Sequence, residues 1–321
     1  MRYGRAALLL LSLLLAASGA QAADKPDKLR VGKAVQVGWT FTICEVAVDQ
    51  GIFAKYGIDA EIIPFAGEAK LMQGFAADAV DIGVGSGPGM VFNAKGSPTI
   101  AVAAYASDPR NIAVIVLPDS PIHSVADLKG KSLSVSSPGS LTEWLVKRIA
   151  VQEGWGPDGI KPVAVNSGSP QVAALKTHQV DGMMSSTEQG YAFEKNGQGR
   201  IIVTMNKYAP VFIAHVIEAQ KSLVEKNPDL VERFLKAYFA TIAFIKTHKD
   251  IDVAIASKVL GSSLAVESRT YDAQVSMLLD DGRFDPAAIE VIKDSSIEMG
   301  QLTERPSTDQ LLTTRFVPVK P

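Results

Sequence analysis

The chain has 321 residues, of which 47% are hydrophobic, 21% charged and 7% aromatic. This composition is typical of a folded globular protein, and it excludes a disordered chain, a collagen-like repeat and a disulfide-stapled miniprotein. Lysine and arginine number 32 against 34 aspartate and glutamate. Because this charge is nearly balanced, we expect no nucleic-acid partner.

The first 22 residues indicate a secretory signal peptide. A short basic start over 1–5 precedes an apolar run over 6–17, and Ala20-Gln21-Ala22 places small residues at the −3 and −1 cleavage positions. The apolar run is too short for a membrane span, which needs ~20 residues. We expect a periplasmic mature chain that begins near Ala23. We expect no lipid anchor, since the single cysteine, Cys44, does not follow the cleavage site.

Strand and helix patterns alternate along the first part of the mature chain. A strand over 29–35, a helix over 42–50 and a strand over 59–65 predict a βαβ unit with parallel strands and a right-handed crossover. The pattern then continues with a helix over 68–77, a strand over 82–85, a helix over 88–95 and a strand over 100–104.

The same order starts again after Gly130, with a strand over 132–135, a helix over 141–152 and a strand over 162–165. The two stretches can be aligned: Val-Asp at 80–81 followed by Ser86 corresponds to Val-Asp at 180–181 followed by Ser186. Matches in the same order across helix, strand and loop favour two similar lobes over chance.

The chain is expected to cross between the lobes twice, near 107–110 and near 207–210. The predicted organisation is a signal peptide over 1–22, a first lobe from 23–108 plus 211–321, and a second lobe over 109–210.

Beyond the second crossing the sequence is mainly helical. Asn227-Pro228 predicts a helix start, and an apolar stripe through residue 246 predicts a helix packed on the core. Further helices are expected over 252–260 and 286–299, and the polar tail from 304 is expected to wrap a lobe surface.

Motifs for catalysis, metals and cofactors are missing from the sequence. The histidines, at 123, 178, 215 and 248, have no metal-ligand spacing, and neither HExxH nor CxxC occurs. The glycine-rich stretch 83–89 fails the dinucleotide fingerprint at Pro88, and Ser86 lacks the flanking glycines of a nucleophile elbow. We therefore predict no metal, no cofactor and no enzymatic activity.

Four hydroxyl-rich loops, 36–42, 86–88, 136–142 and 185–188, follow predicted strands. Ligands of open α/β sheets bind beyond the carboxyl ends of the strands. Each loop alone also suits ordinary helix capping, but four loops that converge on one cleft indicate a ligand site. The candidate ligand-binding residues are Trp39, Thr40, Thr42, Ser86, Gly87, Ser137, Ser140, Thr142, Thr187 and Glu188.

The charges at the helix starts refine this prediction. Thr42 with Glu45, and Ser140 with Glu143, have the spacing of capping boxes, and Glu188 lies in a predicted first turn. The helix after residues 86–88 has no such acid. We therefore expect its free amides to receive an anionic group and Glu188 to receive a donor, unless the glutamates simply face solvent. Trp39 and Phe41 either flank the solute or belong to the core, as aromatic residues beside a strand end often do. Arg110, at the first crossing, either approaches the cleft or is a surface hinge charge.

Segments 48–59, 74–83 and 124–131 resemble the periplasmic solute-binding proteins of ABC importers, in the nitrate-, sulfonate- and taurine-binding branch that is also similar to thiamine-pyrimidine precursor proteins. The resemblance implies a type II periplasmic-binding-protein fold of class α/β, with two lobes, each a mixed sheet flanked by helices, and a ligand cleft between them. It also implies a receptor that closes on a small solute, such as a sulfonate, nitrate, taurine-like molecule or related anion or zwitterion, and delivers it to an ABC permease at the inner membrane.

Two other functions stay open at this level. One is an enzyme of the pyrimidine-precursor type, whose fold is similar, although the chain has an export signal, one cysteine and no catalytic cluster. The other is a secreted ligand-sensing domain. We expect the mature protein to be a monomer.

Overall fold

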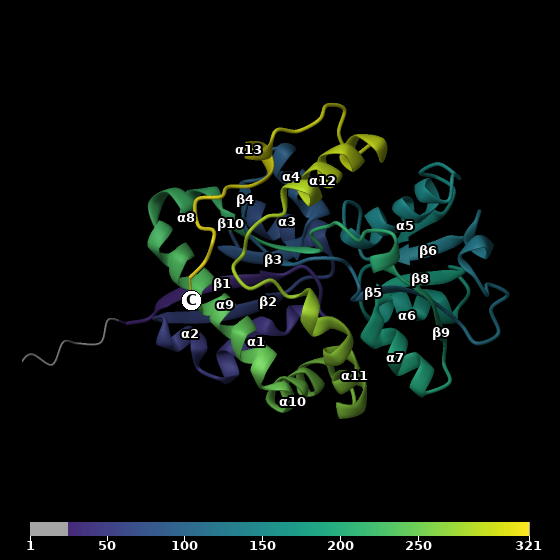
Figure 1. Cartoon of the computed structure of the whole chain (residues 1–321), viewed down its shortest axis with the longest axis horizontal. Helices are drawn as coiled ribbons and strands as arrows, with labels where there is room; N and C mark the ends of the chain where they lie inside the picture. The colour runs from purple at the N-terminus through teal and green to yellow at the C-terminus, as the bar shows by residue number, and fades with distance from the viewer. Residues whose placement is uncertain (1–24, 321) are drawn as a thin grey trace, which may run out of the picture.

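The computed structural model describes residues 25–320, so the predicted signal peptide and cleavage site lie outside the described residues. Two groups of strands lie side by side, each flanked by helices (Figure 1). In the part of the chain that the structure describes, no helix has the length and apolar character needed to cross a membrane.

The first sheet has the strand order β2-β1-β3-β10-β4. β1 runs parallel to β2 and β3, whereas β10 runs antiparallel to β3 and β4. Its strands are β1 Asp27–Lys33, β2 Ile58–Pro64, β3 Ile82–Ser86, β4 Thr99–Ala106 and β10 His215–Gln220.

The second sheet repeats this plan in the order β7-β6-β8-β5-β9. β6 runs parallel to β7 and β8, and β5 runs antiparallel to β8 and β9. Its strands are β5 Ile112–Val116, β6 Ser132–Val135, β7 Lys161–Ala164, β8 Gly182–Ser186 and β9 Arg200–Thr204. Each sheet is mixed, which confirms the predicted fold class.

The Val-Asp repeat has the same structural role in both sheets. Asp81, just before β3, donates its N–H to the carbonyl of Arg30 at 2.9 Å and accepts the Arg30 N–H through Oδ2 at 2.8 Å. Asp181, just before β8, makes the same pair of bonds with Ser132, at 3.0 Å and 2.8 Å. Each aspartate therefore fixes the start of a central strand against its parallel neighbour. This shared role explains why Val-Asp at 80–81 aligns with Val-Asp at 180–181 in the sequence.

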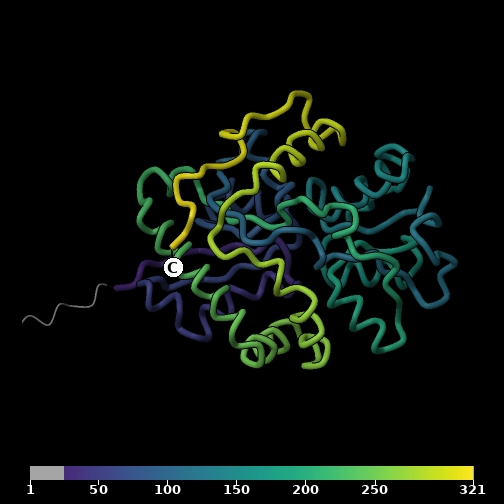
Figure 2. The backbone as a smooth tube through the Cα atoms, viewed as in Figure 1, coloured from purple at the N-terminus to yellow at the C-terminus, as the bar shows by residue number. Residues whose placement is uncertain are grey.

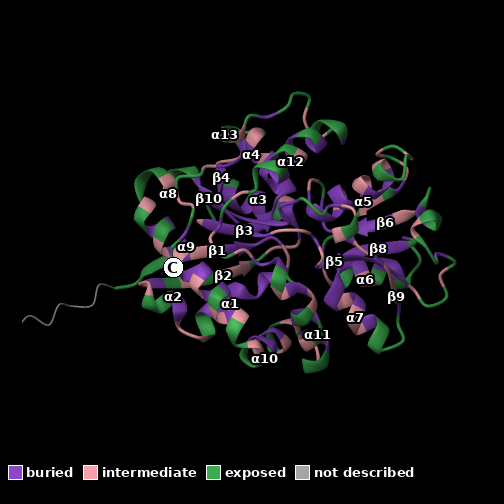
Figure 3. Ribbon diagram, viewed as in Figure 1, coloured by how far each residue is buried: buried purple, intermediate pink, exposed green. Residues whose placement is uncertain are grey.

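Helices cover both sheets, and the most deeply buried segments are the central strands (Figure 3). The helices are α1 Ile43–Asp49, α2 Ile52–Lys55, α3 Glu68–Ala76, α4 Val91–Ala94, α5 Leu141–Gln152, α6 Ser169–Lys176, α7 Thr187–Lys195, α8 Lys221–Lys226, α9 Pro228–Thr247, α10 Lys249–Leu260, α11 Leu264–Gln274, α12 Pro286–Glu298 and α13 Thr308–Leu311.

The long helix α9 begins where the sequence predicts. The Asn227 side chain accepts the Leu230 N–H at 3.3 Å, and Pro228 occupies the first helical position, where its missing N–H costs nothing. The predicted apolar stripe is buried, including Phe234, Tyr238 and Ile242. This helix is therefore a core element.

Two expectations about helices were wrong or incomplete. The helix expected over 88–95 is a 3-10 turn, Pro88–Met90, followed by the four-residue α4. Gly89 and the early proline give this stretch little helix propensity. Helix α11 was not anticipated, because its apolar positions are few.

The chain passes from the first sheet to the second between β4 and β5 and returns between β9 and β10 (Figure 2). The residue boundaries of the two lobes given above stay a prediction. The C-terminal segment returns to the first sheet, where Leu312 bridges to Ala101 of β4 and the Thr313 N–H donates to the Ala101 carbonyl at 2.9 Å.

Candidate functional site

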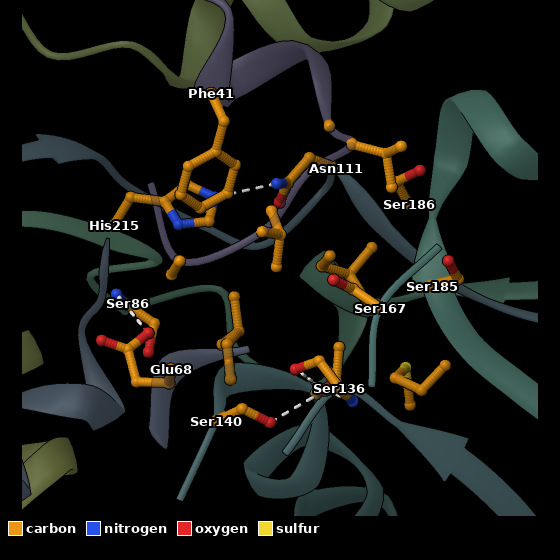
Figure 4. Close-up of a pocket in the computed structure, with 18 of the residues that line it drawn as sticks. Phe41, Glu68, Ser86, Asn111, Ser136, Ser140, Ser167, Ser185, Ser186 and His215 are labelled. Atoms are coloured by element: carbon orange, nitrogen blue, oxygen red, sulfur yellow. Dashed lines mark hydrogen bonds between the residues drawn. The ribbon is translucent and has the colours of Figure 1, made fainter. Parts of the chain in front are cut away.

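A cavity lies between the two sheets. Strand ends and helix starts from both sheets line it (Figure 4). Its apolar lining includes Phe41, Ile112, Leu141 and Met184. Its polar lining residues are Glu68, Ser86, Asn111, Ser136, Ser140, Thr142, Ser167, Gln171, Ser185, Ser186 and His215.

His215 lies at the start of β10 and is almost fully buried. Its ring stacks on Tyr105, with centroids 5.3 Å apart, and meets the edge of Phe41 at 4.8 Å. Burial lowers the pKa of His215 to about 3, so the ring is neutral at physiological pH. Its Nε2 lies 2.8 Å from Nδ2 of Asn111 and 3.3 Å from Oγ1 of Thr40.

Glu68, the first residue of α3, places a carboxyl group at the end of β3. Its Oε2 accepts the Ser86 N–H at 3.1 Å, and burial raises the pKa of this carboxyl. A Cβ atom on Gly85 or Gly89 would stand 2.6 Å or 2.5 Å from Oε1 of Glu68. The glycine-rich stretch 83–89 therefore leaves room for a buried carboxyl group.

The loop between β6 and α5 contributes a cluster of hydroxyl groups. Oγ1 of Thr142 accepts the Ser136 N–H at 3.0 Å and lies 3.1 Å and 2.9 Å from the hydroxyl oxygens of Ser136 and Ser140. Ser140 also accepts the Glu143 N–H at 3.3 Å, so it is the N-cap that the sequence predicts. These hydroxyl groups are therefore largely hydrogen-bonded to one another.

Of the predicted site residues, Ser86, Ser140 and Thr142 line this cavity. Thr40 lies one layer behind, against His215 and Asn111. The other predicted residues make hydrogen bonds within the protein around the cavity. Their roles in ligand binding stay a prediction.

Trp39, Thr187 and Glu188 form a contact between the second sheet and the helices α10 and α11. Glu188 accepts the Trp39 N–H at 2.8 Å and lies 3.4 Å from Gln274 Nε2, which donates at 2.7 Å to the Thr187 hydroxyl. The Trp39 indole N–H donates to Asp252 at 2.7 Å. Glu188 also lines a second cavity, between α7 and the α10–α11 pair.

Ser137 and Gly87 also serve the structure around the cavity. The Ser137 hydroxyl accepts the Ala69 N–H at 3.3 Å, and the Gly87 N–H donates to the Ala214 carbonyl at 3.0 Å. A Cβ on Gly87 would stand 1.9 Å from the Ile213 carbonyl oxygen. Only glycine therefore fits at position 87.

Two electrostatic expectations were wrong. Thr42 does not cap α1, because its hydroxyl donates to the Trp39 carbonyl at 2.8 Å, and Glu45 pairs with Lys33. The amides at 86–88 are not free, because the Ser86 N–H and the Gly87 N–H already donate within the protein. The Glu68 carboxyl also occupies this strand end, so the absence of a local acid did not leave the position without a carboxyl group.

Several lining residues were not on the predicted list, including Glu68, Asn111, Ser167, Gln171 and His215. His215 interrupts an apolar run, and Asn111 directly precedes a strand. Each position therefore indicates a ligand site only weakly from the sequence. Glu68 and Gln171 lie in helices that contact the strand ends only in the folded chain. Arg110 is the surface charge of the alternative interpretation, because it binds Asp108 at 2.8 Å and is not a lining residue.

Hydrogen bonds cross between the two sides of the cavity. Besides the bonds of Glu188 and Ser137, the Ser167 N–H reaches the Ala66 carbonyl at 3.4 Å, and the Trp144 indole donates to Ser295 at 2.8 Å. Elements of both sheets therefore hold the cavity closed. Such contacts can only form when the two sides are together.

A family model described as NMT1/THI5 like matches residues 38–250. This match covers most of the chain. The protein belongs to the NMT1/THI5-like family.

Among curated proteins, this family member is 27% identical over 205 residues to a candidate thiamine biosynthesis protein of Haemophilus influenzae. That match covers 63% of this chain and 64% of the relative, which is less than two thirds of its length. A candidate aliphatic sulfonates-binding protein of Escherichia coli is 23% identical over 261 residues, covering 79% of this chain and 78% of the relative.

Solved structures show the same fold. The alkanesulfonate-binding protein SsuA from Xanthomonas axonopodis, bound to MOPS, aligns with a TM-score of 0.76 at 17% identity, covering 90% of this chain and 97% of that one. The desulfurization enzyme DSZB aligns with a TM-score of 0.61 at 18% identity, covering the same shares. The chain therefore has the two-lobed fold of periplasmic binding proteins, which an enzyme also uses.

Proposed function

We propose that this protein is the solute-binding component of an ABC importer. In this proposal it binds one small solute in the periplasm and delivers it to a permease at the inner membrane. The observation that carries the proposal is the cavity between the two sheets, whose polar lining comes from both.

The geometry suits a receptor that closes on its ligand. Ser86 and His215 approach the cavity from the first sheet, and Ser185 approaches it from the second. A solute that contacts both sides favours the closed state, because it cannot make all its contacts when they are apart. A permease can distinguish the closed, ligand-bound shape from the open one.

The relatives support binding over catalysis. Most of them are named as binding proteins, and two of those described above are named for sulfonates. Within this chain Cys44 is buried in the core, and burial raises its pKa far above the usual range, so it is a poor nucleophile. On this basis the solute class is a sulfonate, a taurine-like zwitterion, nitrate or a related small molecule.

The proposed location follows from the same reasoning. The signal sequence over 1–22 would direct export, the mature protein would be a monomer without a lipid anchor, and its partners would be the solute and the permease. Intact-mass measurement of protein from the periplasm tests export, since retention of residues 1–22 would contradict it.

Thermal-shift measurements on the mature protein test the proposed function. The panel contains nitrate, alkanesulfonates, taurine, pyrimidines and small carboxylates. A specific solute is expected to stabilise the protein by ~3–4 kcal/mol at 100 to 1,000 times Kd. Small-angle scattering should then show a more compact particle at saturation, and uptake of that solute should fail in cells that lack this protein. A panel without any ligand, together with normal uptake, would contradict the proposal.

A further inference from the structure

Two side-chain amides of the cavity lining, those of Gln171 and Asn111, have their N–H groups bonded within the protein and their oxygen atoms available. Gln171 of α6 shows this most directly. Its Nε2 donates to the Met184 carbonyl at 3.1 Å and to the Ser134 carbonyl at 3.4 Å, so both hydrogens are directed at the second sheet. Its Oε1 makes no hydrogen bond with any described residue. The group that Gln171 offers to the cavity is therefore an oxygen.

Asn111, between β4 and β5, is held in the same way. Its Nδ2 donates to the neutral His215 ring at 2.8 Å and to Thr40 at 3.3 Å. Its Oδ1 is buried and has no partner among the described residues. Figure 4 shows Asn111 beside His215, with the hydrogen bond between them as a dashed line. A buried amide oxygen without a donor is costly, so this oxygen calls for a donor from the solute.

Several backbone donors at the strand ends are already used. The N–H groups of Ser86, Gly87 and Ser136 donate to Glu68, Ala214 and Thr142 respectively, and the Thr187 N–H donates to the Asn111 carbonyl at 2.8 Å. These are strand-end amides of the kind that could otherwise bind an anion.

The cavity lining also lacks a cation. Among the described residues no lysine or arginine lines it. The two nearest candidates by sequence are both paired elsewhere, Lys33 with Glu45 and Arg110 with Asp108. The ionisable lining groups are Glu68 and His215, and neither provides a positive charge at neutral pH. A buried anion without a cation is disfavoured, and in this cavity it would depend on hydroxyl donors such as that of Ser167, whose oxygen has no partner among the described residues.

Resting on the proposed function, we propose that the solute is a nitrogen compound whose N–H donors face the side-chain oxygens of Gln171 and Asn111. An ammonium, amidinium or primary amide group on a compact apolar body meets this description, and so does an aminosulfonate zwitterion. A free anion without such donors would leave both oxygens unpartnered. The apolar body lies against Phe41, Leu141 and Met184, which line the same cavity.

Matched pairs of probes test this class by calorimetric titration. Benzamidine and benzoate have similar size and flatness, but only benzamidine has N–H donors. Taurine and ethanesulfonate share the sulfonate and differ in the amine. In each pair the donor-bearing member is expected to bind at least tenfold more tightly. Equal or tighter binding of benzoate or ethanesulfonate would overturn the inference and leave the proposed function intact.

Native mass spectrometry of protein from the periplasm of its own host identifies a retained solute. A solute with an amine, amidine or amide N–H supports the inference, and one without any N–H donor overturns it. If no probe binds and no solute is retained, the proposed function fails, and this inference fails with it.

A pair of variants separates recognition from folding. Gln171→Met removes the cavity oxygen together with two bonds to backbone carbonyls. Gln220→Met is the control, because Gln220 Nε2 also donates to two backbone carbonyls, those of Phe75 and Val80, and does not line the cavity. Gln171→Met is expected to weaken the donor-bearing probe at least tenfold and Gln220→Met less than twofold. Equal losses in the two variants would overturn the assignment of Gln171.

Discussion

The ends of β3 and β8 occupy equivalent places in the two halves, yet they obtain their carboxyl groups differently. Ser86 accepts the Gly89 N–H at 3.1 Å, and Ser186 accepts the Gln189 N–H at 3.4 Å, so both serines cap the turn that follows. The first end receives Glu68 from α3, whereas the second carries Glu188 in its own helix.

The two carboxyl groups also face different surroundings. Glu68 lines the cavity between the sheets, and Glu188 turns to the Trp39 N–H and lines the second cavity. The two halves therefore share the strand plan and the caps but not the destination of the acids.

The largest expected effect is at Gly87. Gly87→Ala would place a Cβ atom 1.9 Å from a backbone oxygen of Ile213, which cannot rotate away. We expect a loss of ~3 kcal/mol or more in the free energy of unfolding, the upper range for overpacking. The equivalent residue of the second half, Thr187, already carries a side chain, so Thr187→Ser should lose less than ~1 kcal/mol. Urea denaturation of both variants measures the difference, and a fully stable Gly87→Ala would contradict it.

Glu188→Ala tests the contact that closes the second half on Trp39. The change removes the acceptor of the Trp39 N–H, and we expect the variant to lose ~1.5–3 kcal/mol of solute binding, the range for a charge-assisted hydrogen bond. Calorimetry with a solute identified from the panel measures the loss. Glu61→Ala, on β2 and outside the cavity lining, is the control. Unchanged affinity in Glu188→Ala would mean that this contact does not contribute to closure.

Stability should fall as the pH rises above about 5, because buried acids are more protonated in the folded state. Burial raises the pKa of both Glu188 and Asp252 to about 7. The stability that these two groups contribute is therefore fully present below their pKa values in the unfolded chain, and it is lost as the pH rises through 7. His215, with its pKa lowered to about 3, acts in the opposite direction. It contributes stability at pH values above the pKa of histidine in the unfolded chain.

We therefore expect maximum stability near pH 5 and a decrease of roughly 2 kcal/mol by pH 8. Denaturant titrations across this range measure it. Glu188→Gln should flatten the decrease, and a decrease of the same size in this variant would exclude Glu188 as its source.

The smallest expected effects are at the two serine caps. Ser186→Ala removes the cap of the nine-residue α7 and should cost ~1 kcal/mol of stability. Ser86→Ala removes a bond to a three-residue turn, and we expect ~0.5 kcal/mol of stability. Thermal unfolding of the pair checks the order. A larger loss in Ser86→Ala would show that its hydroxyl stabilises more than the turn.

Local sequence patterns were sufficient for the elements whose cause is local. The Val-Asp repeat marked the entries to β3 and β8, and Asn227-Pro228 marked the start of α9, because a side chain and its near neighbours decide these features. Ser140 was recognisable as a cap for the same reason. The family resemblance then provided the two-lobed fold, which the mixed sheets and structural neighbours confirm.

The composition of the cavity was decided by tertiary structure. Glu68 and Gln171 reach the strand ends only after α3 and α6 pack on their sheets, and His215 arrives on a strand that returns from the other half of the chain. The predicted capping role of Thr42 was wrong because its hydroxyl donates to the Trp39 carbonyl instead. The sequence by itself determined which strand ends are hydroxyl-rich. Only the folded chain decided which donors remain free, because hydrogen bonds between distant segments use most of them.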